Sequence, residues 1–267
     1  MKIAAAQLAC AVGDISANVA KMREFAERAK RNGAEWIVFP EMSDTGYVMA
    51  VIREKATGWN EGAVPESQTC AQQLSLGLIA GVSERTDDGI FNTQVVIDAS
   101  GAILGKYRKT HLFSPAPIEE HRCFRAGDET TTIALGSFTA GLSICYDLRF
   151  PEFYRSAACE DEANIFVISS AWPFPRVEHL RVLATARAIE NQSYVVLSNR
   201  VGTDDGVTFC GTSAIIDPFG VVIAAAATDR EELIQAEISP EVLRAVRERM
   251  PIFEHRRPEI YRSRVER

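Results

Sequence analysis

A β-strand runs into a polar turn and then a helix in Gly141-Leu142-Ser143-Ile144-Cys145-Tyr146-Asp147-Leu148-Arg149-Phe150-Pro151-Glu152. The strand is expected over 138–144, and the Pro-Glu pair is typical of the first turn of a helix. Cys145 therefore stands at the carboxyl end of a strand and faces a helix N-terminus, where a thiol can be exposed and acidified. A single strand-end cysteine is more often a small buried hydrophobe, so its function depends on what other segments bring to it.

Two further segments end an apolar strand at a charged residue. Trp36-Ile37-Val38-Phe39-Pro40-Glu41 stops at a carboxylate, and Lys109 in Gly105-Lys106-Tyr107-Arg108-Lys109-Thr110-His111-Leu112-Phe113 ends a strand that begins near residue 102. Taken alone, Glu41 could be a solvated loop acid and Lys109 a surface ammonium. In α/β folds, however, ligands gather at the carboxyl ends of strands. We therefore expect Glu41, Lys109 and Cys145 to meet.

These three segments, in this order, resemble the Glu-Lys-Cys triad of the nitrilase superfamily of carbon–nitrogen hydrolases. The resemblance extends from Ala6-Gln7 to Arg257-Pro258-Glu259-Ile260-Tyr261 and so covers nearly the whole chain. It implies one domain over 1–267 with the four-layer αββα sandwich of the nitrilase type. It also implies a homodimer or higher homo-oligomer, with helices 151–159 and 177–191 and the tail from about 251 packing on the partner subunit.

The order of elements agrees with that architecture. We expect helices near 14–32, 67–76, 151–159, 177–191 and 240–250, strands at 36–39, 78–83, 138–144, 165–169 and 194–198, and hairpins that turn at 98–101 and 217–220. Segment 93–104 resembles 212–223, and 34–39 resembles 163–168. These similarities indicate either two pseudo-equivalent halves, each a helix layer on a sheet, or a chance likeness between ordinary hairpins.

Composition excludes several classes of protein. The net charge of −7 over 267 residues argues against binding to a phosphate backbone. No segment approaches the ~18 apolar residues of a membrane span. The six cysteines are widely spaced without a C-x-x-C pair, which argues against zinc and against a disulfide scaffold and favours a reducing cytoplasm.

The resemblance assigns a role to each residue of the triad. Cys145 is the nucleophile, Glu41 the general base, and Lys109 with the backbone N–H of Tyr146 holds the developing oxyanion. No metal or organic cofactor is required. The resemblance also implies a further glutamate at a set distance from a Gly-Asp pair; by its distance from Gly127-Asp128 this acid is Glu120, rather than Glu119, and its implied role is to orient Lys109 or water. The other interpretation is that both acids only solvate a loop.

Pocket walls are expected from aromatic residues that follow the same strand ends. Tyr47 and Trp172 are the candidates, with Tyr146 beside the nucleophile, although their rings could instead fill the core. A Cys–His peptidase is the other catalytic interpretation. The chain lacks a local thiol-protease signature, and no spacing singles out one histidine.

The predicted function is hydrolysis of small aliphatic, non-peptide amides through a thioester. Cys145-Tyr146-Asp147 resembles the amidase branches, and Asn199-Arg200-Val201-Gly202 resembles the aliphatic-amidase and ω-amidase-like groups. Two acids beside the thiol favour neutral amides. The alternatives are an N-carbamoyl amino acid amidohydrolase, which needs a cation such as Arg149 or Arg176, an ω-amidase, a nitrilase, or a non-enzymatic scaffold.

Overall fold

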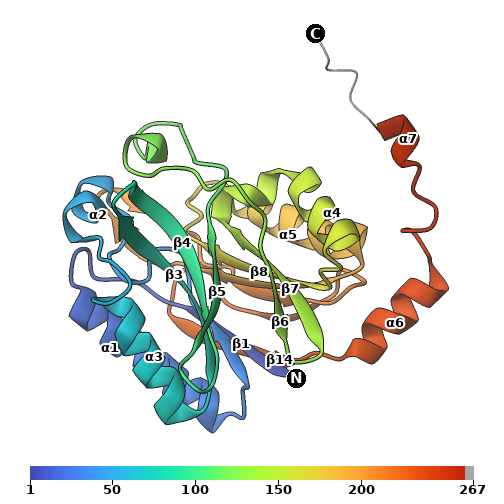
Figure 1. The fold of residues 1–267 in the computed structure, drawn as a ribbon, viewed down its shortest axis with the longest axis horizontal. Helices are drawn as coiled ribbons and strands as arrows, with labels where there is room; N and C mark the ends of the chain where they lie inside the picture. The colour runs from blue at the N-terminus through green and yellow to red at the C-terminus, as the bar shows by residue number, and fades with distance from the viewer. Residues whose placement is uncertain (262–267) are drawn as a thin grey trace.

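Two six-stranded sheets form the centre of the molecule (Figure 1). The computed structural model describes residues 1–261. The first sheet contains, in spatial order, β14 (Glu232–Glu237), β1 (Lys2–Gln7), β2 (Trp36–Val38), β3 (Gly77–Thr86), β4 (Gly89–Ile97) and β5 (Ile103–Arg108). The second contains β6 (Thr132–Leu135), β7 (Phe138–Ile144), β8 (Ile165–Ser170), β9 (Tyr194–Asn199), β12 (Ala214–Ile216) and β13 (Val222–Ala225). A short hairpin of β10 (Thr203–Asp204) and β11 (Val207–Thr208) lies outside both sheets.

Helices cover the outer face of each sheet, which confirms the predicted αββα sandwich. In Figure 1, α1 (Ile15–Arg31) and α3 (Ala63–Leu74) lie on the first sheet, whereas α4 (Pro151–Glu160) and α5 (Val177–Asn191) lie on the second. The alternation of side chains along a strand produces the two interfaces. Ile3 and Ala5 of β1 belong to the core shared with the second sheet, while Ala4 and Ala6 join the core beneath α1 and α3.

The predicted internal repeat is confirmed by the strand order. Each sheet can be crossed strand by strand, the first from its edge strand β14 and the second from its edge strand β6. In both sheets the successive neighbouring pairs are then antiparallel, parallel, parallel, antiparallel and antiparallel. The resembling segments 34–39 and 163–168 contain the equivalent strands β2 and β8. Segments 93–104 and 212–223 contain the equivalent hairpins β4–β5 and β12–β13. The two sheets therefore present equivalent strand ends, and the site draws residues from both.

The helix predicted at 67–76 is placed wrongly. It begins at Ala63, with Pro65 in its first turn, and ends at Leu74. Ser75 takes a left-handed conformation with φ 48°, so the chain leaves the helix before Gly77, which is the first residue of β3. Tertiary pairing extends β3 beyond the predicted apolar core and joins it to β4 in a hairpin.

Elements without a strong apolar pattern were not predicted. They are α2 (Met49–Lys55), the edge strands β6 and β14, the β10–β11 hairpin, α7 (Pro258–Tyr261), and the 3₁₀ turns η1 (Glu120–Arg122) and η2 (Cys145–Arg149). Edge strands pair on one side only, and their half-exposed sequences give a weak signal. The turn η2 matters most, because it begins with Cys145 and occupies the predicted polar turn before α4.

The chain beyond β14, an edge strand of the first sheet, leads away from the two sheets. The helix α6 (Pro240–Arg249) buries Leu243 and Val246, and the segment that follows runs along the edge of the view in Figure 1. Ile260 and Tyr261 are exposed. The predicted packing of the tail from 251 on a partner remains a prediction, and residues 262–267 lie outside the described residues. Among the helices of the described chain, none has the length and apolar character needed to span a membrane.

Candidate active site

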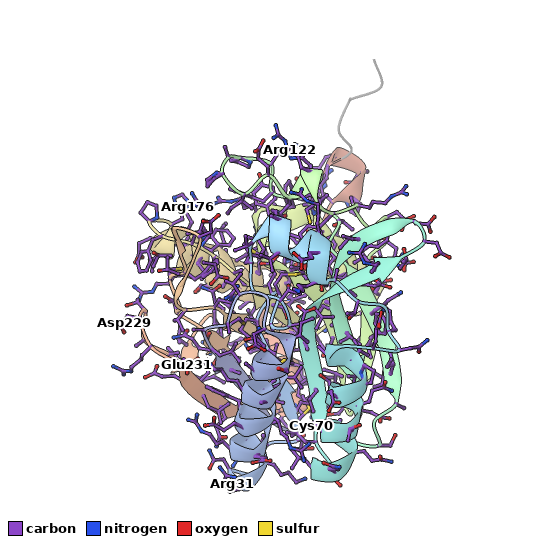
Figure 2. The ribbon with its side chains drawn as sticks, turned by 90° about the vertical axis from the view of Figure 1, so that its left-hand side faces the viewer. Arg31, Cys70, Arg122, Arg176, Asp229 and Glu231 are labelled. Atoms are coloured by element: carbon purple, nitrogen blue, oxygen red, sulfur yellow. The ribbon has the colours of Figure 1, made fainter. Side chains whose placement is uncertain are left out.

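The ends of three strands bring the three predicted residues together. Glu41 follows β2, Lys109 directly follows β5 in the same sheet, and Cys145 directly follows β7 in the other sheet. All three side chains are buried. Figure 2 shows Arg176, which shares a cavity with Cys145, toward one end of the molecule, and Arg31 at the opposite end. The site therefore lies where the strand ends of both sheets converge.

Lys109 is the centre of the charged group. Its Nζ donates to Glu41 Oε1 at 2.9 Å and to Glu120 Oε1 at 2.8 Å, and all three side chains are inaccessible to solvent. Glu120 also accepts the Tyr47 hydroxyl at 2.5 Å and the Phe113 N–H at 2.6 Å. The neighbouring acid, Glu119, instead pairs with Arg122 near the surface. The structure thus places Glu120, selected by its spacing, in the same cluster.

Glu41 is fixed by two further donors that the sequence analysis did not identify. The Asn92 amide donates to Glu41 Oε1 at 2.6 Å, and the Ala171 N–H donates to Glu41 Oε2 at 2.8 Å. Asn92 also accepts the Lys109 N–H through its backbone carbonyl at 2.8 Å. An asparagine within a buried strand is unusual, and this signal could have revealed Asn92. A backbone N–H such as that of Ala171 leaves no signal in the sequence.

Glycine permits the close approach of the chain at Glu41. A Cβ on Gly81 would lie 2.6 Å from Glu41 Cα and from Pro40 O, which is closer than real side chains come. The Ser43 N–H donates to the Gly81 carbonyl at 2.8 Å, so the loop that carries Glu41 lies directly on β3. Only glycine at position 81 leaves Glu41 space at this depth.

The turn at Cys145 is held by Asp147. Cys145 has φ 46°, a left-handed conformation that costs energy in a residue with a side chain. Asp147 accepts the Ile144 N–H at 2.9 Å and the Tyr107 hydroxyl at 2.7 Å, and lies 2.8 Å from His111 Nδ1. These contacts join the turn to the segment that carries Lys109. Within residues 1–261 no hydrogen bond joins the His111 ring to the Cys145 sulfur, which disfavours a Cys–His peptidase.

Burial keeps the resting thiol neutral. Burial, followed by the charge of Glu41, raises the pKa of Cys145 far above its ordinary value, and Lys109 offsets only part of this. The expectation of an acidified thiol is therefore wrong for the resting protein. The helix begins at Pro151 as predicted, but two carboxylates lie near a single ammonium. A thiolate here would add a third buried negative charge.

Glu41 and Glu120 share one cation, and the pKa values of Glu41 and Lys109 follow from that arrangement. Burial raises the pKa of Glu41, because the opposing pull of Lys109 is weaker and Glu120 adds to the rise. For Lys109, burial alone lowers the pKa, but Glu120 and Glu41 outweigh burial and raise it well above its ordinary value. Lys109 therefore stays charged, and Glu41 can accept a proton readily.

The pH profile of amide hydrolysis should reflect these shifts. A base acts only when ionised, so kcat/KM should fall on acidification with an apparent pKa above the ordinary glutamate value of about 4.3. The raised pKa of Lys109 predicts no loss of its charge below about pH 10. Initial rates between acidic and alkaline pH, on an uncharged amide so that substrate ionisation plays no part, measure both limbs. An apparent pKa of the acid limb at or below the ordinary pKa of glutamate would contradict the assignment of Glu41 as the base.

A small cavity opens beside Cys145. Its walls include all three predicted pocket residues, Tyr47, Tyr146 and Trp172. Tyr47 and Trp172 are also almost completely buried, so their rings pack in the core and line the cavity at the same time.

Two arginines line the same cavity. The Arg149 guanidinium lies 4.7 Å from the centre of the Trp172 ring and close to His179, while that of Arg176 lies 5.6 Å from the Phe113 ring. Over residues 1–261, neither guanidinium forms an ion pair. Cations without anionic partners beside a nucleophile favour a substrate that carries a negative charge.

Neither a metal-binding cluster nor a disulfide is present in the described part of the chain. No cluster of three or more His, Cys, Asp and Glu side chains there has a geometry suited to a metal ion. The six cysteines are all free thiols.

Comparisons of the sequence point to one family. The family model for carbon–nitrogen hydrolases matches residues 2–248. A 2-oxoglutaramate amidase of Bacillus subtilis is 35% identical over 260 residues, which are 97% of this chain and 98% of that protein. An omega-amidase, YafV of Escherichia coli (strain K12), is 34% identical over 238 residues, covering 88% of this chain and 90% of the relative.

Solved structures agree with the sequence comparisons. A CN-hydrolase superfamily protein from Xanthomonas campestris, with an arsenic adduct in its active site, superposes with a TM-score of 0.90 at 27% identity and covers 96% of this chain and 97% of its own. Nit3 of Saccharomyces cerevisiae, a member of branch 10 of the nitrilase superfamily, superposes with a TM-score of 0.86 at 28% identity and 94% coverage of both chains.

Proposed function

The chain belongs to the carbon–nitrogen hydrolase family and is an amidase, and we propose that it acts as an ω-amidase. Its substrates are then short amides with a carboxylate at the end opposite the amide, such as 2-oxoglutaramate or succinamate. The products are the corresponding dicarboxylate and ammonia. The relatives from Bacillus subtilis and Escherichia coli carry these activities in their names, which supports the proposal.

The observation that carries the substrate class is the pair of arginines in the cavity. Arg149 and Arg176 line the same space as Cys145 and lack anionic partners within the described residues. Bound carboxylate would supply the missing charge, and guanidinium groups bind carboxylates with directed hydrogen bonds. Neutral amides were expected because Glu41 and Glu120 lie near the thiol. Lys109 offsets that charge locally, so the arginines decide the preference.

The first half of the reaction forms a thioester. As the Cys145 sulfur attacks the amide carbon, Glu41 takes the thiol proton, which the neutral resting thiol makes necessary. Glu41 then gives this proton to the departing nitrogen. The carbon–nitrogen bond breaks, ammonia leaves, and the acyl group remains on the sulfur.

The negative oxygen of the tetrahedral intermediate needs donors in place before the reaction. Lys109 Nζ and the Tyr146 N–H serve this purpose in the proposal. Tyr146 lies in the first turn of η2, where N–H groups have no partner within the helix. Each such donor contributes about 2.7–4 kcal/mol to stabilising the transition state. The hydrogen bonds from Lys109 to both glutamates hold its ammonium in position.

The second half of the reaction releases the acid. Glu41 takes a proton from water, the resulting hydroxide adds to the thioester carbon, and the carbon–sulfur bond breaks. Glu41 returns its proton to the Cys145 sulfur, and the product acid loses its own proton and leaves as the second carboxylate. Glu41 and Cys145 account for every proton and bond that the protein supplies in this sequence, Lys109 holds the oxyanion, Glu120 orients Lys109, and the mechanism requires no cofactor.

The bond specificity can be tested with three compounds that share one carboxylate tail. Succinamate presents an amide, 3-cyanopropionate a nitrile, and N-carbamoyl-β-alanine a carbamoyl group. We expect succinamate to give the highest kcat/KM for ammonia release, because a nitrile adds a nitrogen anion where the donors are placed for oxygen. A higher kcat/KM for the nitrile or for the carbamoyl compound would overturn the ω-amidase proposal.

A further inference from the structure

Arg200 and Asp204 form a buried charged pair that the reaction does not use. Arg200 follows β9 and is completely inaccessible to solvent, and Asp204 ends β10 and is 3% exposed. Arg200 Nη1 lies 2.7 Å from Asp204 Oδ2. The angles of this contact are not those of a hydrogen bond, and within residues 1–261 none of the three guanidinium nitrogens has a hydrogen-bond acceptor. Asp204 is thus the carboxylate that balances this buried cation.

Asp204 reaches the active site through Tyr47. The same oxygen, Asp204 Oδ2, accepts the Tyr47 N–H at 2.8 Å. Phe209 lies between the two residues: the Arg200 guanidinium is 4.6 Å from its ring centre, and the Tyr47 ring packs edge-on against it at 6.0 Å. Both the backbone and the ring of Tyr47 are therefore positioned by groups that depend on this charged pair.

Tyr47 in turn contacts the group around Lys109. Its hydroxyl donates to Glu120 Oε1 at 2.5 Å, the same oxygen that accepts Lys109 Nζ. Burial and the charge of Glu120 raise the pKa of Tyr47 well above its ordinary value, so the phenol keeps its proton and remains a donor. A shift of Tyr47 would change the position of Glu120 and, through it, of the ammonium.

We propose that Arg200 and Asp204 are positioning residues that act on catalysis through Tyr47. The pair sets the place of the Tyr47 hydroxyl, which orients Glu120 and Lys109 toward the substrate oxygen. The inference rests on the proposed roles of Glu120 and Lys109. It differs from a purely structural role, in which the pair would only anchor the β10–β11 hairpin, because it predicts that its effect passes through one hydroxyl group.

A double-mutant cycle tests this route. Asp204→Asn and Tyr47→Phe should each lower kcat/KM by about 10–100-fold, since small displacements of catalytic groups cost this much. The combined variant should lose no more than about threefold beyond the worse single variant, because Asp204 has nothing left to position once the hydroxyl is absent. If the two losses multiply, the positioning role is wrong.

Controls separate positioning from general loss of stability. Phe25→Leu, in the core beneath α1 and remote from the cavity, should lower the melting temperature without lowering kcat/KM. If Phe25→Leu reproduces the loss seen with Asp204→Asn, the proposal fails. Should Asp204→Asn not fold, Arg200→Met/Asp204→Leu takes its place in the same cycle. That variant leaves no unpaired charge and no acceptor for the Tyr47 N–H.

A second readout keeps this inference distinct from the proposed substrate. Iodoacetamide is itself a small amide and alkylates Cys145 without needing any particular acid product. The rate of this alkylation, measured for wild type, Asp204→Asn, Tyr47→Phe and the combined variant, should show the same lack of additivity as kcat/KM. If wild-type protein hydrolyses no amide, the ω-amidase proposal fails while the alkylation cycle still tests the positioning pair. If wild type hydrolyses amides but the losses are additive in both readouts, the positioning proposal for Arg200 and Asp204 is wrong and the ω-amidase proposal is unaffected.

Discussion

Replacing Cys145 by alanine should lower kcat for amide hydrolysis by about 10⁴-fold or more. The loss is large because the proposed route passes through a bond to this sulfur, and no other thiol lines the cavity among the described residues. Ammonia release under saturating succinamate measures the effect. The melting temperature should stay close to that of wild type, since the side chain is small and alanine can keep the turn that Asp147 holds.

A second cysteine supplies the matched control. Cys70 is also buried, but it lies on α3, away from Arg176 and the cavity (Figure 2). Cys70→Ala should therefore retain activity. Substantial turnover by Cys145→Ala, with contamination excluded by the double variant Cys145→Ala/Glu41→Gln, would show that the reaction proceeds without the thioester.

The second large effect is a change of substrate preference on loss of the cavity arginines. Succinamide differs from succinamate only in having a second amide in place of the carboxylate. Arg149→Gln/Arg176→Gln should lower kcat/KM for succinamate by at least about 100-fold, because two charge-assisted hydrogen bonds are lost at about 1.5–3 kcal/mol each. The value for succinamide should change little, so the preference for the anion disappears.

The control for this prediction lies on α5, the helix that directly follows Arg176. Arg181 is an exposed arginine of α5 that pairs with Glu178 and does not line the cavity. Arg181→Gln should leave both kcat/KM values unchanged. If the double variant at Arg149 and Arg176 lost activity equally on succinamate and succinamide, the arginines would serve the shape of the cavity and not the recognition of charge.

The sequence predicted those features that local patterns record. Glu41, Lys109 and Cys145 each stand at the end of an expected strand, so the α/β pattern predicted that they would meet, although they come from two different sheets. The two pseudo-equivalent halves were also visible, because each hairpin and each central strand keeps a similar order of apolar and polar residues. The spacing that selected Glu120 led to the residue that contacts Lys109.

Features set by tertiary packing were not predictable in the same way. The Ala171 N–H that binds Glu41 comes from the second sheet, and nothing in its own segment indicates that contact. The resting pKa of Cys145 depends on burial and on the balance between Lys109 and two acids, which the local sequence does not contain. The preference for neutral amides was inferred from those acids alone, whereas Arg149 and Arg176 enter the cavity from η2 and from the start of α5.

The most direct test of the account is the rate at which Cys145 becomes acylated. Wild-type protein is mixed with succinamate or succinamide, the reaction is stopped by acid within the first turnover, and the peptide that contains Cys145 is weighed by mass spectrometry. The account predicts that succinamate places a succinyl group on Cys145. It also predicts that this acylation is at least about tenfold faster than acylation of Cys145 by succinamide. Turnover of succinamate with no acyl group on Cys145, or faster acylation by succinamide, would contradict it.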